Sequence, residues 1–313
     1  MKKILAMLVA LTMLVGGLGI SAIAEEETAN DYKIGILAPA VTHGWVAAVA
    51  YYAEQRCQEL GLDYTVATSN NAEEMTTQLS DLLVWGADAI VAFPQWEGME
   101  DPIQEAVDAG VIVVNFDIDI AVDGVYKVTG DNYGMGVAGA EYIVDKIGTE
   151  GTVVALTVPT SGSVNDLRMQ GFTDTMAEIA PDIEIKEYAT QFTREAGLAD
   201  MADILTAEPE IDAVYSLDDE TSIGALQAID EAGRTDIQVI TGGGGCQEYF
   251  NMMPEYENIW VQSALYSPAM VEDAVDMAVA LLNGEEVESP LTVPTAVVDR
   301  DNYTEYLDEN TPY

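Results

Sequence analysis

The chain has 313 residues, more than a single hydrophobic core usually serves, and its length predicts two domains. Its 55 acidic and 11 basic residues give a formal net charge of -44. Phosphate groups would be repelled over so acidic a surface, which excludes nucleic acid as a partner.

The first 24 residues have the pattern of a secretory signal. Lys2 and Lys3 precede an apolar run over 4–20, and the small residues 22–24 come before Glu25. Cleavage after residue 24 would remove two positive charges and leave a mature chain with a net charge of about -46. An uncleaved anchor is the alternative, although the run is short for spanning a bilayer. No cysteine stands at the expected cleavage site, so we expect an unlipidated protein in the periplasm or outside the cell.

Beyond the signal, strand-like and helix-like segments alternate almost without interruption. Strands are predicted at 33–38, 62–68, 89–93, 111–116, 125–129, 152–158, 183–189, 212–217, 236–241 and 258–265. Helices are predicted at 44–60, 72–85, 99–109, 133–147, 164–179, 194–206, 220–232 and 268–283, with Gly61, Gly110 and Gly233 as C-terminal caps. Alternation of this kind, with strands that are apolar throughout, predicts α/β domains with parallel sheets covered on both faces.

The two cysteines are not expected to form a disulfide. Cys57 lies on the apolar face of the first predicted helix, which favours a core position, and Cys246 lies far along the chain.

Six predicted strands end in small polar or aromatic groups. These groups are 42–45, 94–96, Asp117, 165–166, 218–220 and the glycine run 242–245. Ligands of open α/β sheets bind beyond the carboxyl ends of the strands, so we expect these groups to form the walls of one site.

The same residues favour binding over catalysis. His43 is the only histidine, and a general base would need a nucleophile and an orienting partner, for which we find no motif. The glycine run lacks the lysine and the serine or threonine of a phosphate-binding loop. The aspartates at 117–119 and 218–219 lack the spacing of a calcium loop, and capping of helix N–H groups is their alternative role. We therefore expect no enzyme, no metal and no cofactor.

Several segments together give the chain a family resemblance. They are 33–39 with the aromatic helix that follows, 82–90, 109–114, 130–133, 168–172 and 218–225. In their order and spacing the chain resembles the sugar-type periplasmic binding proteins, the extracytoplasmic receptors of ABC importers. The resemblance implies a type I fold with two doubly wound parallel-sheet lobes, a hinge of three crossings, and a ligand trapped by closure. The first lobe would then comprise 31–131 plus 267–290, and the second 132–266 plus 291–313.

The resemblance also implies which residues bind ligand. The positions that correspond are His43, Trp45, Asp117, Asn165, Asp166, Phe192, Asp218 and Tyr266. Carboxylates and amides in such sites bind pairs of hydroxyls, and aromatic rings stack on the apolar face of a sugar. We add Trp96 for its place after a strand, and Arg168 as the one nearby cation.

Three positions depart from the ribose-binding members of the family. Ile118 and Asp166 stand where those members have arginines, and Gly243 stands where they have an aspartate. The resemblance therefore makes ribose doubtful and predicts a more acidic and locally wider pocket, in which Arg168 either touches ligand or pairs with Asp166.

The function implied is that of a monomeric receptor for a monosaccharide, a polyol or a similar hydroxylated molecule, with an ABC transporter permease as its partner. A receptor for an amine-bearing ligand, or for a chemotaxis or signalling partner, stays open as an alternative. A transcriptional regulator of the same fold would carry a helix-turn-helix where this chain has its signal, so we do not expect one.

Overall fold

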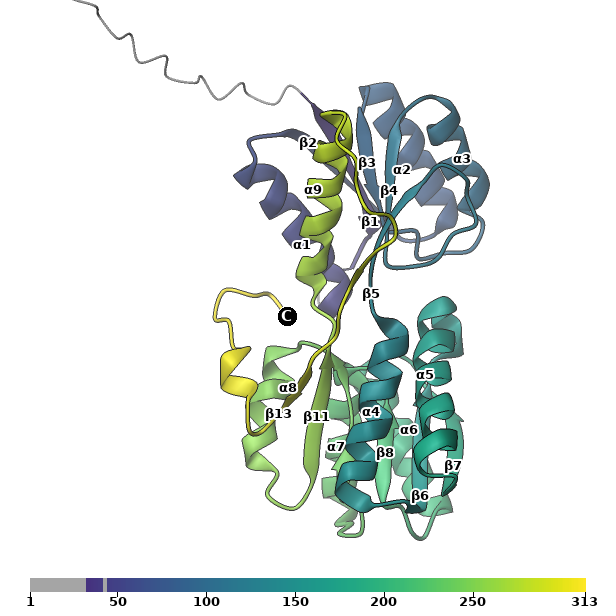
Figure 1. The fold of residues 1–313 in the computed structure, drawn as a ribbon, viewed down its shortest axis with the longest axis vertical. Helices are drawn as coiled ribbons and strands as arrows, with labels where there is room; N and C mark the ends of the chain where they lie inside the picture. Colours follow the sequence, from purple (N-terminus) through teal and green to yellow (C-terminus); the bar gives the residue numbers. More distant parts are fainter. Residues whose placement is uncertain (1–31, 42–43) are drawn as a thin grey trace, which may run out of the picture.

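The structure is a computed structural model that describes residues 32–41 and 44–313. The expected signal at 1–24 and the predicted ligand contact His43 lie outside the described residues. The described chain forms two α/β lobes, one above the other in Figure 1, which confirms the predicted fold class.

The first lobe contains a six-stranded, fully parallel sheet in the order β12-β5-β4-β3-β1-β2. Its strands are β1 (Lys33–Pro39), β2 (Asp63–Ser69), β3 (Ala89–Ala92), β4 (Ile112–Phe116), β5 (Tyr126–Gly130) and β12 (Leu291–Val293). Helices α1 (Gly44–Glu59) and α9 (Val271–Leu282) pack with one face, and α2 (Ala72–Trp85) and α3 (Glu100–Asp108) with the other. Because both faces are covered, the central strand β3 is buried over its whole length.

The second lobe contains a seven-stranded sheet in the order β10-β11-β9-β8-β6-β7, with β13 antiparallel to β11. Its strands are β6 (Glu150–Thr157), β7 (Asp182–Ala189), β8 (Ala213–Ser216), β9 (Val239–Ile240), β10 (Gly243–Gly244), β11 (Trp260–Leu265) and β13 (Val297–Asp299). Helices α4 (Asn132–Ile147) and α5 (Ser163–Ile179) pack with one face, and α6 (Arg194–Ala207), α7 (Asp219–Ala232) and α8 (Gln247–Met252) with the other.

Three segments connect the lobes: β5 to α4, the turn after β11, and β12 to β13. Since β5 and β11 lead directly into crossings, the carboxyl ends of both sets of parallel strands face the other lobe. The third crossing differs from the prediction, which returned the chain to the second lobe at residue 291. Residues 291–293 still pair with β5, whose edge offers free backbone groups, and the chain crosses only after Val293.

Most predicted elements are present within one or two residues of their expected limits, and the differences are local. The predicted helix at 268–283 begins as a 3-10 turn, Pro268–Met270, before α9. Part of the glycine run is the short strand β10, and α8 follows it. Gly233 caps α7 in a left-handed conformation, as predicted. Cys57 and Cys246 are both buried and free. In the part of the chain that the structure describes, no helix is long and apolar enough to cross a membrane.

Candidate functional site

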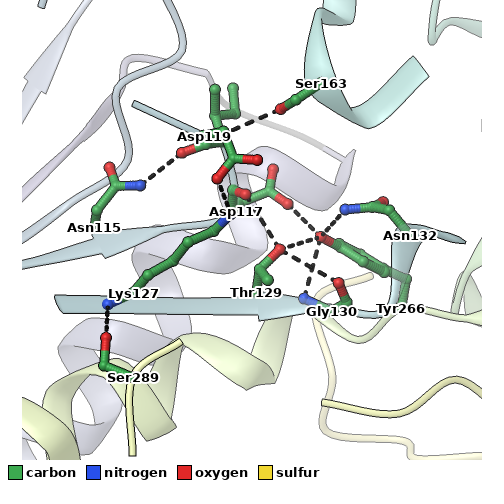
Figure 2. A network of polar contacts seen from close by, with 11 residues as sticks. Asn115, Asp117, Asp119, Lys127, Thr129, Gly130, Asn132, Ser163, Tyr266 and Ser289 are labelled. Carbon is green, nitrogen blue, oxygen red and sulfur yellow. Dashed lines mark hydrogen bonds and ion pairs between the residues drawn. The ribbon is translucent and has the colours of Figure 1, made fainter. Parts of the chain in front are cut away.

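A buried polar network lies where two crossings meet the ends of β4 and β5 (Figure 2). Its centre is the hydroxyl of Tyr266, which donates to Oδ1 of Asp117. The same hydroxyl accepts from Nδ2 of Asn132 at 3.0 Å and from the backbone N–H of Gly130 at 3.3 Å. Asp117 follows a strand of the first lobe, whereas Asn132 begins a helix of the second, so the network joins both lobes.

The backbone at Asp117 is held in an uncommon conformation. Its φ is 67°, the only left-handed value of a non-glycine residue in the described ranges 32–41 and 44–313. Aspartate tolerates this region better than most residues, and such strain persists where surrounding contacts fix it. Here the Asp117 N–H donates to the carbonyl of Val128, and the Thr129 hydroxyl donates to the carbonyl of Asp117. These contacts aim the carboxylate at the crossings.

Burial dominates the electrostatics of Asp117. The residue is 7% exposed, and desolvation raises the pKa of its carboxyl group. The hydrogen bond from Tyr266 and the charge of Arg168 oppose that rise in pKa. The carboxylate thus has one hydroxyl partner, and the charge of Lys127 acts on it in the same direction as that of Arg168, more weakly.

Arg168 is the buried cation of this region. It is 5% exposed, and its Nε donates to Oδ1 of Asn132 at 2.8 Å while an Nη donates to the Leu217 carbonyl at 2.7 Å. Its guanidinium carbon lies 4.7 Å from the centre of the Tyr266 ring and 6.0 Å from that of Phe192. Arg168 therefore connects the hinge to two loops of the second lobe.

The possible ion pair between Arg168 and Asp166 is not formed, and that alternative was wrong. Asp166 lies exposed on the first turn of α5, whereas Arg168, half a turn later, points inward. Residues two positions apart on a helix lie on different faces, which explains why Asp166 and Arg168 do not meet.

Asp218 caps α7 from the end of β8. Its carboxylate accepts from the N–H groups of Glu220 and Thr221, both at 3.2 Å, which confirms the capping role. Burial, followed by the charge of Asp219, raises the pKa of Asp218 to about 7, and the charge of Arg168 opposes the rise. Asp218 thus lies beside the same cation as Asp117.

This raised pKa predicts a pH-dependent effect of Asp218→Asn. In the folded protein the Asp218 carboxyl group keeps its proton up to about pH 7, whereas in the unfolded chain it loses the proton near pH 4. Because the folded state then binds more protons, the free energy of unfolding of the wild type falls as pH rises between these values. Asparagine keeps the cap and cannot ionise, so the stability of the variant relative to wild type should rise by about 2 kcal/mol between pH 5 and 8. Urea unfolding at both pH values measures this, with the exposed Asp182→Asn as control. A difference independent of pH would contradict the prediction.

Trp45 lies beside the network at the start of α1. Its Nε1 donates to the Tyr266 carbonyl at 2.6 Å, and its ring lies 6.1 Å from the Phe116 ring, nearly parallel to it, and 6.0 Å from the Phe93 ring, edge-on. The indole is thus fixed in orientation and remains only partly buried. A fixed and partly exposed ring is suited to stacking on a ligand.

The remaining predicted residues lie apart from the network. Asn165 accepts from the Val158 N–H at 2.8 Å and donates to Asp166 at 3.1 Å. Both residues line an open groove of about 380 Å³ between α5 and β7, next to Met169 and Gln170. Trp96 packs against the cluster beneath α2 and α3. The structure therefore brings together Trp45, Asp117, Arg168, Phe192, Asp218 and Tyr266, and leaves Asn165, Asp166 and Trp96 outside this group.

The predicted widening at Gly243 is also not present. An added Cβ there would overlap the terminal methyl of Met135, so a side chain from α4 already occupies the space. The glycine run itself is held by Asp219, whose carboxylate accepts from the N–H groups of Gly245 and Cys246 at 2.9 Å and from the Ser263 hydroxyl at 3.1 Å.

Sequence reasoning missed Asn132 and Met135. The predicted lobe boundary falls beside Asn132, and the amide of that residue was its one signal, because a polar residue at a buried helix start needs partners. Nothing in the local sequence indicated that Met135 reaches the glycine run.

Comparison with known proteins identifies the family. The model of the periplasmic binding protein domain matches residues 34–286. The chain is similar to a xylitol-binding protein of Mycolicibacterium smegmatis, with 26% identity over 91% of this chain and 83% of that protein. It is also similar to the ribose import binding protein RbsB of Salmonella typhimurium, with 26% identity over 92% of this chain and 97% of that protein.

A solved galactofuranose binding protein superposes with a TM-score of 0.81 at 26% identity, covering 90% of this chain and 100% of that one. These relatives are binding proteins, which confirms the interpretation of the chain as a binding protein and not an enzyme. The chain belongs to the periplasmic binding protein domain family.

Proposed function

We propose that this protein is an exported receptor that binds a neutral sugar or polyol between its lobes and delivers it to an ABC transporter permease. The observation that carries the proposal is the buried Asp117 carboxylate. It accepts a hydrogen bond from the hydroxyl of Tyr266, beside the fixed ring of Trp45. A carboxylate next to an aromatic face is suited to a molecule with hydroxyls on its edge and an apolar face. The names of the relatives, which bind xylitol, ribose and galactofuranose, support the same class of ligand.

Export of the protein and the limits of its two lobes belong to the same proposal. Residues 1–24 would direct export and be removed, and the mature protein would act as a monomer in the periplasm or at the cell exterior. The first lobe would comprise 31–131 plus 267–293, and the second 132–266 plus 294–313, because residues 291–293 pair with β5 of the first lobe.

The local charges favour a neutral ligand over an amine. Two buried carboxylates, Asp117 and Asp218, lie near the guanidinium of Arg168, whose charge opposes the rise in pKa that burial causes in each. Because the site carries its own cation, it does not need a positive charge from the ligand.

A thermal-shift screen tests the proposal. We expect at least one compound in a panel of sugars, sugar acids, polyols and amino sugars to stabilise the mature protein, and nucleotides to leave it unchanged. Ligand at a thousand times its dissociation constant adds about 4 kcal/mol of stability, which such a screen detects easily. Silence across the panel, together with a shift by nucleotides, would overturn the proposal.

Replacement of Asp166 by asparagine separates the two ligand classes. Asp166 is exposed in the groove between α5 and β7, outside the buried network, so loss of its charge should change the affinity for a neutral ligand less than threefold. A ligand whose amine pairs with Asp166 in this groove should lose tenfold or more, about 1.4 kcal/mol. Calorimetric titration of both proteins with the strongest compound of the screen measures the difference. A tenfold loss would favour the amine.

A further inference from the structure

The last residues of the chain extend from the second lobe back toward the first. After the 3-10 turn Tyr303–Glu305, Gln247 of α8 fixes the segment twice. Its Nε2 donates to the Tyr306 carbonyl at 3.2 Å, and its Oε1 accepts from the Asp308 N–H at 2.8 Å. In Figure 1 this yellow segment then turns into the space between α8 and α1.

Residues 311–313 contact both lobes. The hydroxyl of Thr311 accepts from the hydroxyl of Tyr52 on α1 at 2.5 Å. Tyr313 is 7% exposed and belongs to the buried cluster of the second lobe, with Cys246 and Tyr249. The chain end thus has a polar contact on the first lobe and an apolar seat in the second.

The facing surface of α1 is built to receive this segment. Among the residues that the structure describes, Ala48 is the one buried member of that cluster that comes from the first lobe, and Trp45 and Tyr52 pack against the cluster. Positions 45, 48 and 52 share one face of a helix. Trp45 lies beside the buried polar network. On the same face of α1, Ala48 lies one turn later and Tyr52 two turns later, where they contact the cluster and the chain end.

The glycine run leaves room for Tyr313. An ideal Cβ at Gly244 would lie 2.8 Å from the Tyr313 hydroxyl oxygen, and the φ of Gly244 is 141°, which side-chain-bearing residues rarely adopt. A glycine at this position therefore allows the tyrosine to sit against β10.

We propose that residues 307–313 form a strap, a fourth connection that holds α1 and its Trp45 against the second lobe. The three crossings are continuous chain and permit hinge motion, whereas the strap contacts both lobes only while α1 lies close to the second lobe. Contacts that exist in one arrangement alone shift the population toward it. The strap should therefore favour the closed arrangement before any ligand binds.

The test uses the mature, ligand-free protein, so it does not depend on the proposed ligand. Deletion of residues 307–313 should increase the radius of gyration in solution scattering and speed amide hydrogen exchange over residues 45–52 about tenfold. Tyr313→Ala should act in the same direction at full length, which keeps the test valid if the deleted protein folds poorly.

A matched pair of variants on α1 tests the polar contact. Tyr52→Phe removes the donor to Thr311 and should speed the same exchange about threefold. Tyr51→Phe is the control, because the Tyr51 hydroxyl is exposed and accepts only from Gln55 of its own helix. An unchanged radius and unchanged exchange in the deleted protein and in Tyr313→Ala, or equal effects of Tyr52→Phe and Tyr51→Phe, would overturn the strap.

Discussion

Replacing Asp117 with alanine is expected to abolish binding of the sugar or polyol found in the screen, a loss of a hundredfold or more in affinity. Hydrogen bonds to a charged group contribute about 1.5–3 kcal/mol each when a partner is removed, and a carboxylate that binds a pair of hydroxyls loses both. The substitution would also leave the Tyr266 hydroxyl without its acceptor. Isothermal titration calorimetry against the wild type measures the loss.

Two further variants separate the carboxylate from its backbone. Alanine is strained at the left-handed φ of residue 117, whereas asparagine tolerates it, so Asp117→Asn should fold as the wild type does and still lose at least tenfold in affinity. Asp119→Ala removes an exposed carboxylate two residues away, paired with Lys127, and should bind normally. Wild-type affinity in Asp117→Ala would show that the binding site lies elsewhere.

The residues predicted at strand ends lie where the topology of a parallel sheet puts them. Asp117 and Asp218 follow β4 and β8, so the order of strands and crossings brings them to the facing edges of the lobes; Tyr266, which the family resemblance implied, follows β11. Trp45 was placed by the same rule, at the helix that follows β1. These positions depend on the path of the backbone, which hydrophobic periodicity reports well.

The side-chain contacts of Asp166, Arg168 and Met135 could not be predicted from the sequence, because they depend on the direction in which each side chain points. Asp166 and Arg168 are two residues apart, and only the phase of α5 decides that one faces solvent and the other the hinge. The partners of Arg168 come from α4 and from the loop after β8, far from it in sequence. Met135 fills the space at Gly243 by the same kind of distant contact. Such contacts follow from packing in three dimensions and have no local pattern.

Arg168 lies beside two buried carboxylates, Asp117 and Asp218. We therefore expect it to contribute more to stability than its lack of an ion pair suggests. In the described residues Arg168 takes part in no salt bridge, yet its charge lies close enough to oppose the burial-driven rise in the pKa of both Asp117 and Asp218. Its hydrogen bonds also fix the Asn132 amide, which in turn donates to Tyr266. Removing it therefore affects charge and geometry together.

Arg168→Leu should accordingly lower the free energy of unfolding by about 3–5 kcal/mol at neutral pH, the range for breaking a buried charge arrangement. Arg194→Leu is the control: it removes the same charge from the same lobe, but Arg194 is 38% exposed and pairs with the partly buried Glu220 and the exposed Glu248, so about 1 kcal/mol is expected. Urea unfolding without ligand compares the two variants.

If the loss arises from uncompensated carboxylates, Asp218→Asn should recover part of it in the Arg168→Leu background. A double-mutant cycle measures this coupling. Equal losses in the two arginine variants would contradict a central role for Arg168, because then burial beside Asp117 and Asp218 would add nothing to what an exposed arginine contributes.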